Sequence, residues 1–132
     1  MIDESMITVK GEVYWLWVAY EPYIKKYLLM DISKDRTTLT CYYFIKRLKR
    51  LYGNRYTICT DVADHYYHQT CRWLRIRHNM YDQEDKNIME RVIQYIKDRT
   101  ECFDDNFPFK DNCNREHVNK NWFRAFMNDI TN

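Results

Sequence analysis

The stretch that decides the fold is Val13-Tyr14-Trp15-Leu16-Trp17-Val18-Ala19, a run of β-branched and aromatic side chains. Such side chains favour extended backbone, so the run predicts a strand. Glu21-Pro22 ends it, because proline cannot continue a central ladder. Residues 1–10 alternate apolar and polar side chains before this strand, and residues 25–32 form another apolar segment after it. Short turns between the three segments predict an antiparallel meander.

After the meander, helical and strand patterns alternate along the chain. Apolar residues at helical spacing predict helices at about residues 39–52, 63–74, 83–100 and 115–127. Short runs between them predict strands at residues 56–60 and 75–78. Gly53-Asn54 is expected to end the first helix with a left-handed cap. This order predicts an α/β fold of the ribonuclease-H-like type, in which helices flank one mixed sheet of five strands.

Length and composition limit the class of protein. The 132 residues fit one domain, and 45% of them are hydrophobic, which supplies a core and argues against disorder. No apolar run approaches the roughly 20 residues that span a bilayer, and the acidic N-terminus does not resemble a signal peptide. We therefore expect a cytoplasmic protein without a membrane segment. The five scattered cysteines lack a C-x-x-C pair, which argues against a disulfide framework or a structural zinc site.

Basic residues are concentrated locally although the formal net charge is only +2. The predicted helix at residues 39–52 carries a cluster that consists of Lys46, Arg47, Lys49 and Arg50. Two interpretations remain open from the sequence. The cluster is either a solvated helix face or a patch that contacts the phosphates of a nucleic acid.

Three carboxylates fall at positions where chemistry is expected. Asp3 lies in the first predicted strand, Asp61 follows the fourth strand, and Glu90 lies inside the long helix. Converging carboxylates repel one another unless a cation is present, and with two Mg²⁺ ions they suit in-line phosphoryl transfer. The chain has 19 acidic residues, however, so a surface helix acid at Glu90 and a helix N-cap at Asp61 remain alternatives.

Three sequence motifs resemble one known family. They are Ile2-Asp3-Glu4-Ser5, Ile58-Cys59-Thr60-Asp61 and Asn87-Ile88-Met89-Glu90-Arg91. In this order and spacing they resemble the DDE transposases of prokaryotic insertion sequences, which belong to the retroviral integrase superfamily. The resemblance runs from about residue 1 to residue 126. It identifies residues 1–132 as the catalytic core of such a protein, without the N-terminal DNA-binding region.

The resemblance implies a function and a site. Asp3, Asp61 and Glu90 would be the catalytic residues and the ligands of two Mg²⁺ or Mn²⁺ ions that serve DNA strand cleavage and strand transfer. Lys97, seven positions after Glu90, would contact DNA. Transposon ends and target DNA would be the substrates, and self-association is expected. An alternative is a truncated, inactive remnant that binds DNA or protein, and ribonuclease H is a third hypothesis that no motif supports.

Overall fold

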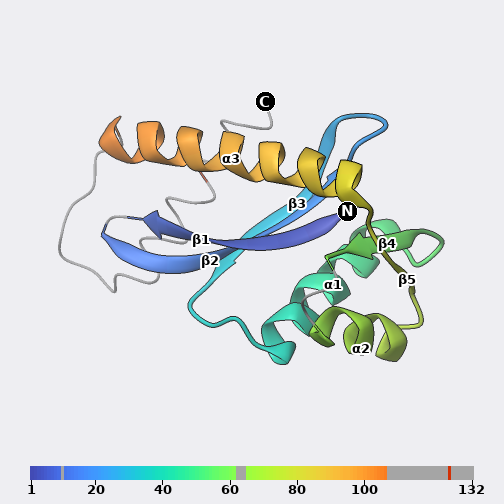
Figure 1. The fold of residues 1–132 in the computed structure, drawn as a ribbon. Helices are drawn as coiled ribbons and strands as arrows, with labels where there is room; N and C mark the ends of the chain where they lie inside the picture. Colours follow the sequence, from blue (N-terminus) through green and yellow to red (C-terminus); the bar gives the residue numbers. More distant parts are fainter. Residues whose placement is uncertain (10, 62–64, 107–124, 126–132) are drawn as a thin grey trace.

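The computed structural model describes residues 1–9, 11–61, 65–106 and 125. Its N-terminal quarter is an antiparallel sheet in the order β1 (Ile2–Val9), β2 (Glu12–Glu21) and β3 (Lys26–Ser33) (Figure 1). The register pairs Asp3 with Val18. The predicted meander is therefore confirmed.

The remaining described elements are three helices and two short strands. They are α1 (Thr38–Tyr52), β4 (Thr57–Thr60), α2 (His65–Trp73), β5 (Arg77–Met80) and α3 (Gln83–Asn106). Strands β4 and β5 pair in parallel around α2, as a strand–helix–strand unit requires. The helix predicted at residues 115–127 lies outside the described residues, apart from residue 125.

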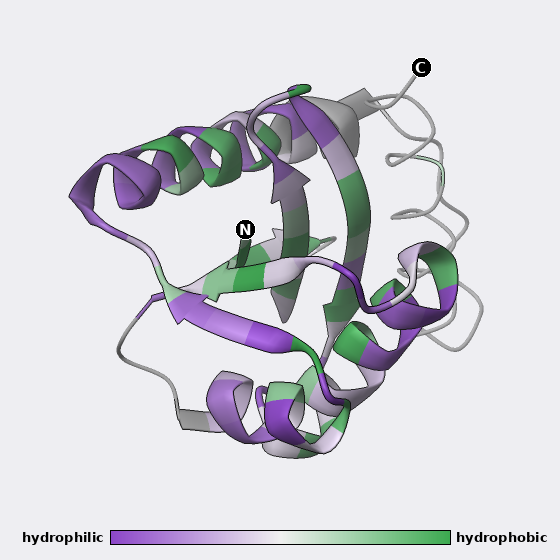
Figure 2. Cartoon of the chain, turned by 90° about the vertical axis from the view of Figure 1, so that its right-hand side faces the viewer, coloured by the Kyte–Doolittle hydropathy of each residue, from purple (hydrophilic) through white to green (hydrophobic). Residues whose placement is uncertain are grey.

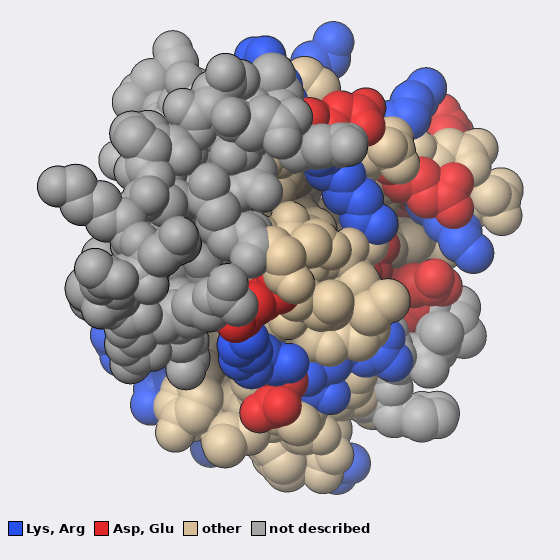
Figure 3. Space-filling model, turned by 90° about the vertical axis from the view of Figure 1, so that its left-hand side faces the viewer, with Lys and Arg blue, Asp and Glu red and all other residues tan. Residues whose placement is uncertain are grey.

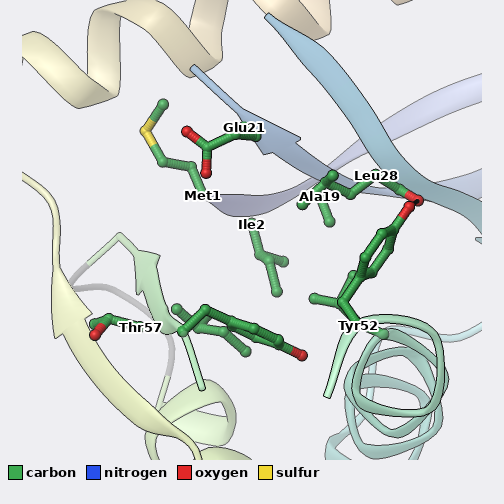
Figure 4. Close-up of a pocket in the computed structure, with 10 residues that line it drawn as sticks. Met1, Ile2, Ala19, Glu21, Leu28, Tyr52 and Thr57 are labelled. Carbon is green, nitrogen blue, oxygen red and sulfur yellow. Dashed lines mark hydrogen bonds between the residues drawn. The ribbon is translucent and has the colours of Figure 1, made fainter. Parts of the chain in front are cut away.

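The predicted five-stranded sheet is not formed as one ladder. Within the described residues the strands make a three-stranded and a two-stranded sheet, and β4 lies beside β1 without pairing with it. One cause is local, because the Glu4 N–H donates to Asp3 Oδ1 at 2.9 Å instead of to a neighbouring strand. A pocket of about 210 Å³ lies in this region, with Met1, Ile2, Thr57 and Ile58 among its lining residues (Figure 4).

Helices cover both faces of the meander. On one face, Val92, Ile93 and Ile96 of α3 pack on a cluster that includes Ile7 and Val9. On the other face, α1, α2 and the β4–β5 pair pack on a second cluster, which includes Ile2, Trp17, Phe44, Ile45 and Tyr67. Figures 1 and 2 show these layers, with hydrophobic residues gathered along the strands and on the inward sides of the helices. The first cluster holds α3 along β1, and Figure 1 shows the first turns of α3 near the start of that strand.

Local signals explain most helix ends. Thr37 caps α1 through a capping box with Thr40. Gly53 ends α1 at φ 81° and ψ −157°, so it has positive φ but not the predicted left-handed helical conformation. Arg75, at φ 56°, ends α2, and the Ile76 N–H then donates to Cys71 O at 2.9 Å.

Two further expectations concern membrane-spanning helices and the cysteines. Among the described residues, no helix is long and apolar enough to cross a membrane. Cys41, Cys59 and Cys71 are free thiols, and Cys41 and Cys71 are buried. Burial raises the pKa of Cys71 to about 12, so this thiol is a core residue rather than a nucleophile.

Candidate metal centre

Asp3 lies on the face of β1 that α3 covers. Strand residues alternate between faces, and Ile7 and Val9 pack against α3, so Asp3 shares their side of the sheet. Glu4 points to the opposite face, where it is buried. Asp3 and Glu4 therefore face opposite ways, as successive residues of a strand do.

The carboxylate of Asp3 is held at the edge of β1. Met1 and Tyr20 exchange two backbone hydrogen bonds of 2.8 Å, and an antiparallel ladder alternates bonded and non-bonded pairs. The N–H of Glu4 therefore points away from β2, toward β4. Because this N–H donates to Asp3 Oδ1, the Asp3 carboxylate lies along the β1 edge that faces β4.

Asp61 follows β4 directly and lies beneath the start of α3. Ile58 belongs to the cluster on the α1 and α2 side, so alternation places Asp61 on the α3 side, as it places Asp3. Lys86, in the first turn of α3, brings Nζ within 3.9 Å of Asp61 Oδ2. Both side chains are partly exposed, at 44% for Lys86 and 34% for Asp61. Asp61 is thus accessible to solvent, and the ammonium group of Lys86 lies beside its carboxylate.

Glu90 lies on the same stripe of α3 as Lys86. At 100° per residue, Glu90 stands about 40° and Lys97 about 20° around the helix from Lys86. Glu90 is exposed and Lys97 is half-buried. The stripe that reaches Asp61 through Lys86 therefore carries Glu90 one turn further along, and Lys97 two turns beyond that.

Asp3 and Asp61 lie on the α3 side of their strands and Glu90 lies on the α3 stripe that begins at Lys86, but the three carboxylates do not form a preassembled cage. Among the described residues, no three His, Cys, Asp or Glu side chains lie close enough together to hold a metal ion. The donor set nevertheless suits Mg²⁺ or Mn²⁺, which prefer carboxylate oxygens and retain water ligands. Its assembly would require the Asp61 carboxylate to leave Lys86.

The structure divides the basic cluster of α1 into two pairs. Arg47 is bonded to Asp31 at 2.6 Å, and Lys49 donates from Nζ to Leu74 O at 2.9 Å, beside the end of α2. These two residues tie α1 to β3 and α2. Lys46 and Arg50 are exposed on one side of the helix, with the ammonium of Lys46 over the Tyr42 ring at 5.6 Å. Contact with DNA remains a prediction, and within the cluster it fits Lys46 and Arg50 better.

Charges of both signs are interspersed on the face drawn in Figure 3. Blue and red side chains alternate around an uncharged area there, so the described part of this face presents no single-sign field.

Sequence reasoning missed two residues near the candidate centre, Lys86 and Glu4. The i, i+4 spacing of Lys86 and Glu90 is a signal for the first, but the partners of Glu4 lie more than 60 residues away in sequence.

A pocket also lies between the start of β1 and β4, with Leu48 and Tyr52 of α1 on one wall (Figure 4). Most of its lining is apolar, with Glu21 and Thr57 as exceptions. Neither Asp3, Asp61 nor Glu90 lines it. The pocket therefore lies outside the candidate metal centre.

Comparison with known proteins gives one weak sequence relative. No family model matches the chain. The chain is 26% identical over 126 residues to the uncharacterized protein MJ0017 of Methanocaldococcus jannaschii. The alignment covers 96% of this chain and 57% of that protein, so the chain spans little more than half the length of its relative.

Solved structures give a closer likeness in fold. The intasome of simian T-cell lymphotropic virus in complex with PP2A regulatory subunit B56 gamma matches with a TM-score of 0.65 and 20% identity, over 82% of this chain and 42% of that one. The HTLV-2 integrase catalytic core domain in complex with magnesium matches in its trimeric form with a TM-score of 0.61 and 19% identity, over 81% and 73% of the two chains. Its dimeric form matches equally well, over 82% and 74%. The chain therefore has the mixed α/β fold of a retroviral integrase catalytic core.

Proposed function

We propose that this chain is the catalytic core of a DDE transposase of the prokaryotic insertion-sequence kind, which cleaves DNA strands and joins them to a target. The observation that supports the proposal is that Asp3 and Asp61 both lie on the α3 side of an integrase-like fold, with Glu90 one helical turn after Lys86, which contacts Asp61. In this view β4 and β5 continue the meander at β1, as the two outer strands of a ribonuclease-H-like sheet.

The roles follow from position. Asp3, Asp61 and Glu90 would hold two Mg²⁺ or Mn²⁺ ions, which when bound activate a water or 3′-hydroxyl and stabilise the leaving oxygen. The Glu4 N–H orients Asp3, and Asp61, which now contacts Lys86, would bind the metal ions in place of that contact. Lys97 would bind a phosphate of the DNA on the same stripe as Glu90, and Lys46 and Arg50 would add phosphate contacts from α1.

Substrates and assembly are part of the proposal. The DNA would be transposon ends and a target duplex, and the chain would act as a homo-oligomer. The magnesium-bound HTLV-2 integrase core supports the choice of metal, and its trimeric and dimeric forms support self-association.

A strand-transfer assay on a short duplex that carries the ends of the encoding element tests the proposal. Product is expected only with Mg²⁺ or Mn²⁺, and Asp61→Asn should abolish it. Asp35→Asn is the matched control, because Asp35 is an exposed aspartate in the loop before α1. Equal product from wild type and Asp61→Asn would contradict the assignment.

One observation favours a second candidate, a non-catalytic remnant that binds DNA or another transposase subunit. Within the described residues no three-ligand metal group is formed, and Lys86 supplies positive charge beside Asp61. A remnant would bind DNA in a salt-sensitive way that Asp61→Asn leaves unchanged, and it would cleave nothing. Affinity that does not fall as salt rises would exclude this candidate.

A further inference from the structure

The most unusual polar group of the described chain is the side chain of Glu4. It is only 2% exposed, and both carboxylate oxygens accept hydrogen bonds from tyrosines. The Tyr66 hydroxyl donates to Oε1, and the Tyr67 hydroxyl donates to Oε2. The Arg36 guanidinium lies 3.8 Å from Oε1. A carboxylate buried to this extent is tolerated only when several donors satisfy it.

Aromatic rings enclose these contacts. The Trp17 ring meets Tyr66 edge-on at 6.0 Å and Tyr67 at 6.3 Å between centroids. Ser33 Oγ accepts a hydrogen bond of 2.8 Å from Trp17 Nε1, which fixes the indole. Burial raises the pKa of Tyr67, and the charge of Glu4 raises it further, so its hydroxyl remains a donor throughout the physiological pH range. The arrangement, which we call the Glu4 clamp, consists of Glu4, Tyr66 and Tyr67.

The clamp joins the two segments that carry the proposed catalytic aspartates. Glu4 follows Asp3 directly, and its own N–H binds Asp3 Oδ1 at 2.9 Å. Tyr66 and Tyr67 stand in the first turn of α2, the helix that begins after Asp61. Within the described residues no hydrogen-bonded ladder connects β1 to β4. The relation between these two strands therefore rests on side-chain contacts, and the Glu4 clamp is a buried polar tether between the two segments.

We propose that Glu4 is a positioning residue whose clamp by Tyr66 and Tyr67 sets the separation of Asp3 and Asp61 for metal binding. The inference rests on the proposed function. A leucine-like side chain would fill the same buried site without desolvating a charge, and replacing buried ionic groups by apolar ones is often stabilising. The carboxylate instead fixes how β1 and α2 are oriented relative to each other. Two directed hydrogen bonds restrict the angle between them more narrowly than apolar packing does.

Manganese binding by the whole chain tests the clamp, measured by calorimetry and by water-proton relaxation. Measurements are made at a temperature where circular dichroism shows each variant fully folded. Glu4→Gln and Tyr67→Phe should weaken Mn²⁺ binding about tenfold, the low end of the effect of losing a direct hydrogen-bond partner of a metal ligand, because the clamp holds the segments of Asp3 and Asp61 and not their carboxylates. Tyr66→Phe is a milder variant, because it keeps the hydrogen bond from Tyr67 to Glu4, and it is used if the other two variants fail to fold. We expect it to weaken Mn²⁺ binding severalfold. Glu12→Gln is the control, because Glu12 is a carboxylate of the same sheet that pairs with Lys34 at the surface.

The outcomes separate the two proposals. A wild-type chain that binds no Mn²⁺ would overturn the proposed function, and the clamp inference with it. Wild-type affinity in folded Glu4→Gln, Tyr67→Phe and Tyr66→Phe would overturn the clamp inference alone. A purely structural role would lower the unfolding midpoint of these variants without changing the Mn²⁺ affinity of the folded molecules. In a strand-transfer assay, the positioning role predicts that the variants require more Mn²⁺ for half-maximal rate.

Discussion

Replacing Lys86 by glutamine should strengthen metal binding at Asp61. The Lys86 ammonium lies 3.9 Å from Asp61 Oδ2. A metal ion bound to that oxygen would therefore lie close to a positive charge. Two unit charges at about 4 Å interact by roughly 1 kcal/mol in water, and a divalent ion would meet roughly twice this repulsion from the ammonium. At about 1.4 kcal/mol per tenfold, Lys86→Gln should bind Mn²⁺ roughly five- to thirtyfold more tightly at low salt.

Stability should respond much less than affinity. Both side chains are partly exposed, and exposed ion pairs contribute about 0–1 kcal/mol to folding. We therefore expect the free energy of unfolding of Lys86→Gln to stay within about 1 kcal/mol of wild type.

Calorimetric titration with Mn²⁺ at low and at moderate salt is the assay. Arg91→Gln is the matched control, because it removes one positive charge from the exposed surface of α3 about 140° around the helix from Lys86. The gain should be specific to Lys86 and should shrink as salt screens the repulsion. The reasoning is refuted if Lys86→Gln binds Mn²⁺ no more tightly than wild type, or if Arg91→Gln gains as much.

Further predictions concern the core, pH, DNA binding and a turn. Ile96→Ala, on the buried face of α3 with 0% exposure, should lower the free energy of unfolding by about 2–5 kcal/mol in urea titrations. Burial and the charge of His68 lower the pKa of His78, so the unfolded chain takes up this proton first as pH falls. Stability should therefore decline from pH 7 to 5, less so in His78→Gln, as compared by urea midpoints. Lys97→Gln should reduce the slope of log affinity for DNA against log salt by about 0.9 in fluorescence titrations. Arg75→Gly should raise the unfolding midpoint by relieving positive φ, although glycine's unfolded-state entropy offsets part of the roughly 1 kcal/mol gain.

Local patterns predicted most elements, and the errors have local causes. The strand predicted at residues 75–78 begins instead at Arg77, because Arg75 takes positive φ to end α2 and the Ile76 N–H binds back to Cys71 O. Helix α3 runs to Asn106, beyond the predicted residue 100. The single five-stranded sheet was predicted from element order alone, and order does not reveal that Asp3 takes the Glu4 N–H that faces β4.

Contacts between residues far apart in the chain could not be predicted from the sequence. Spacing put Lys49 and Arg47 in one basic cluster with Lys46, but their partners Leu74 and Asp31 lie in other elements. Alternation placed Asp3 and Glu4 on opposite faces, yet it did not indicate that Glu4 would be clamped by two tyrosines of α2. Periodicity thus assigns residues to faces, whereas the partners on those faces depend on how the elements pack.

The central claim is that Asp3, Asp61 and Glu90 bind divalent metal ions together. Its most direct test is the paramagnetic broadening of assigned backbone amide signals during a Mn²⁺ titration, with Asp61→Asn in parallel. The account predicts that signals next to all three carboxylates broaden first and together, and that Asp61→Asn removes the effect. A folded wild-type chain in which these signals stay sharp, or broaden no earlier than that of Glu12, which lies at the opposite end of the β1–β2 ladder from Asp3, would contradict it.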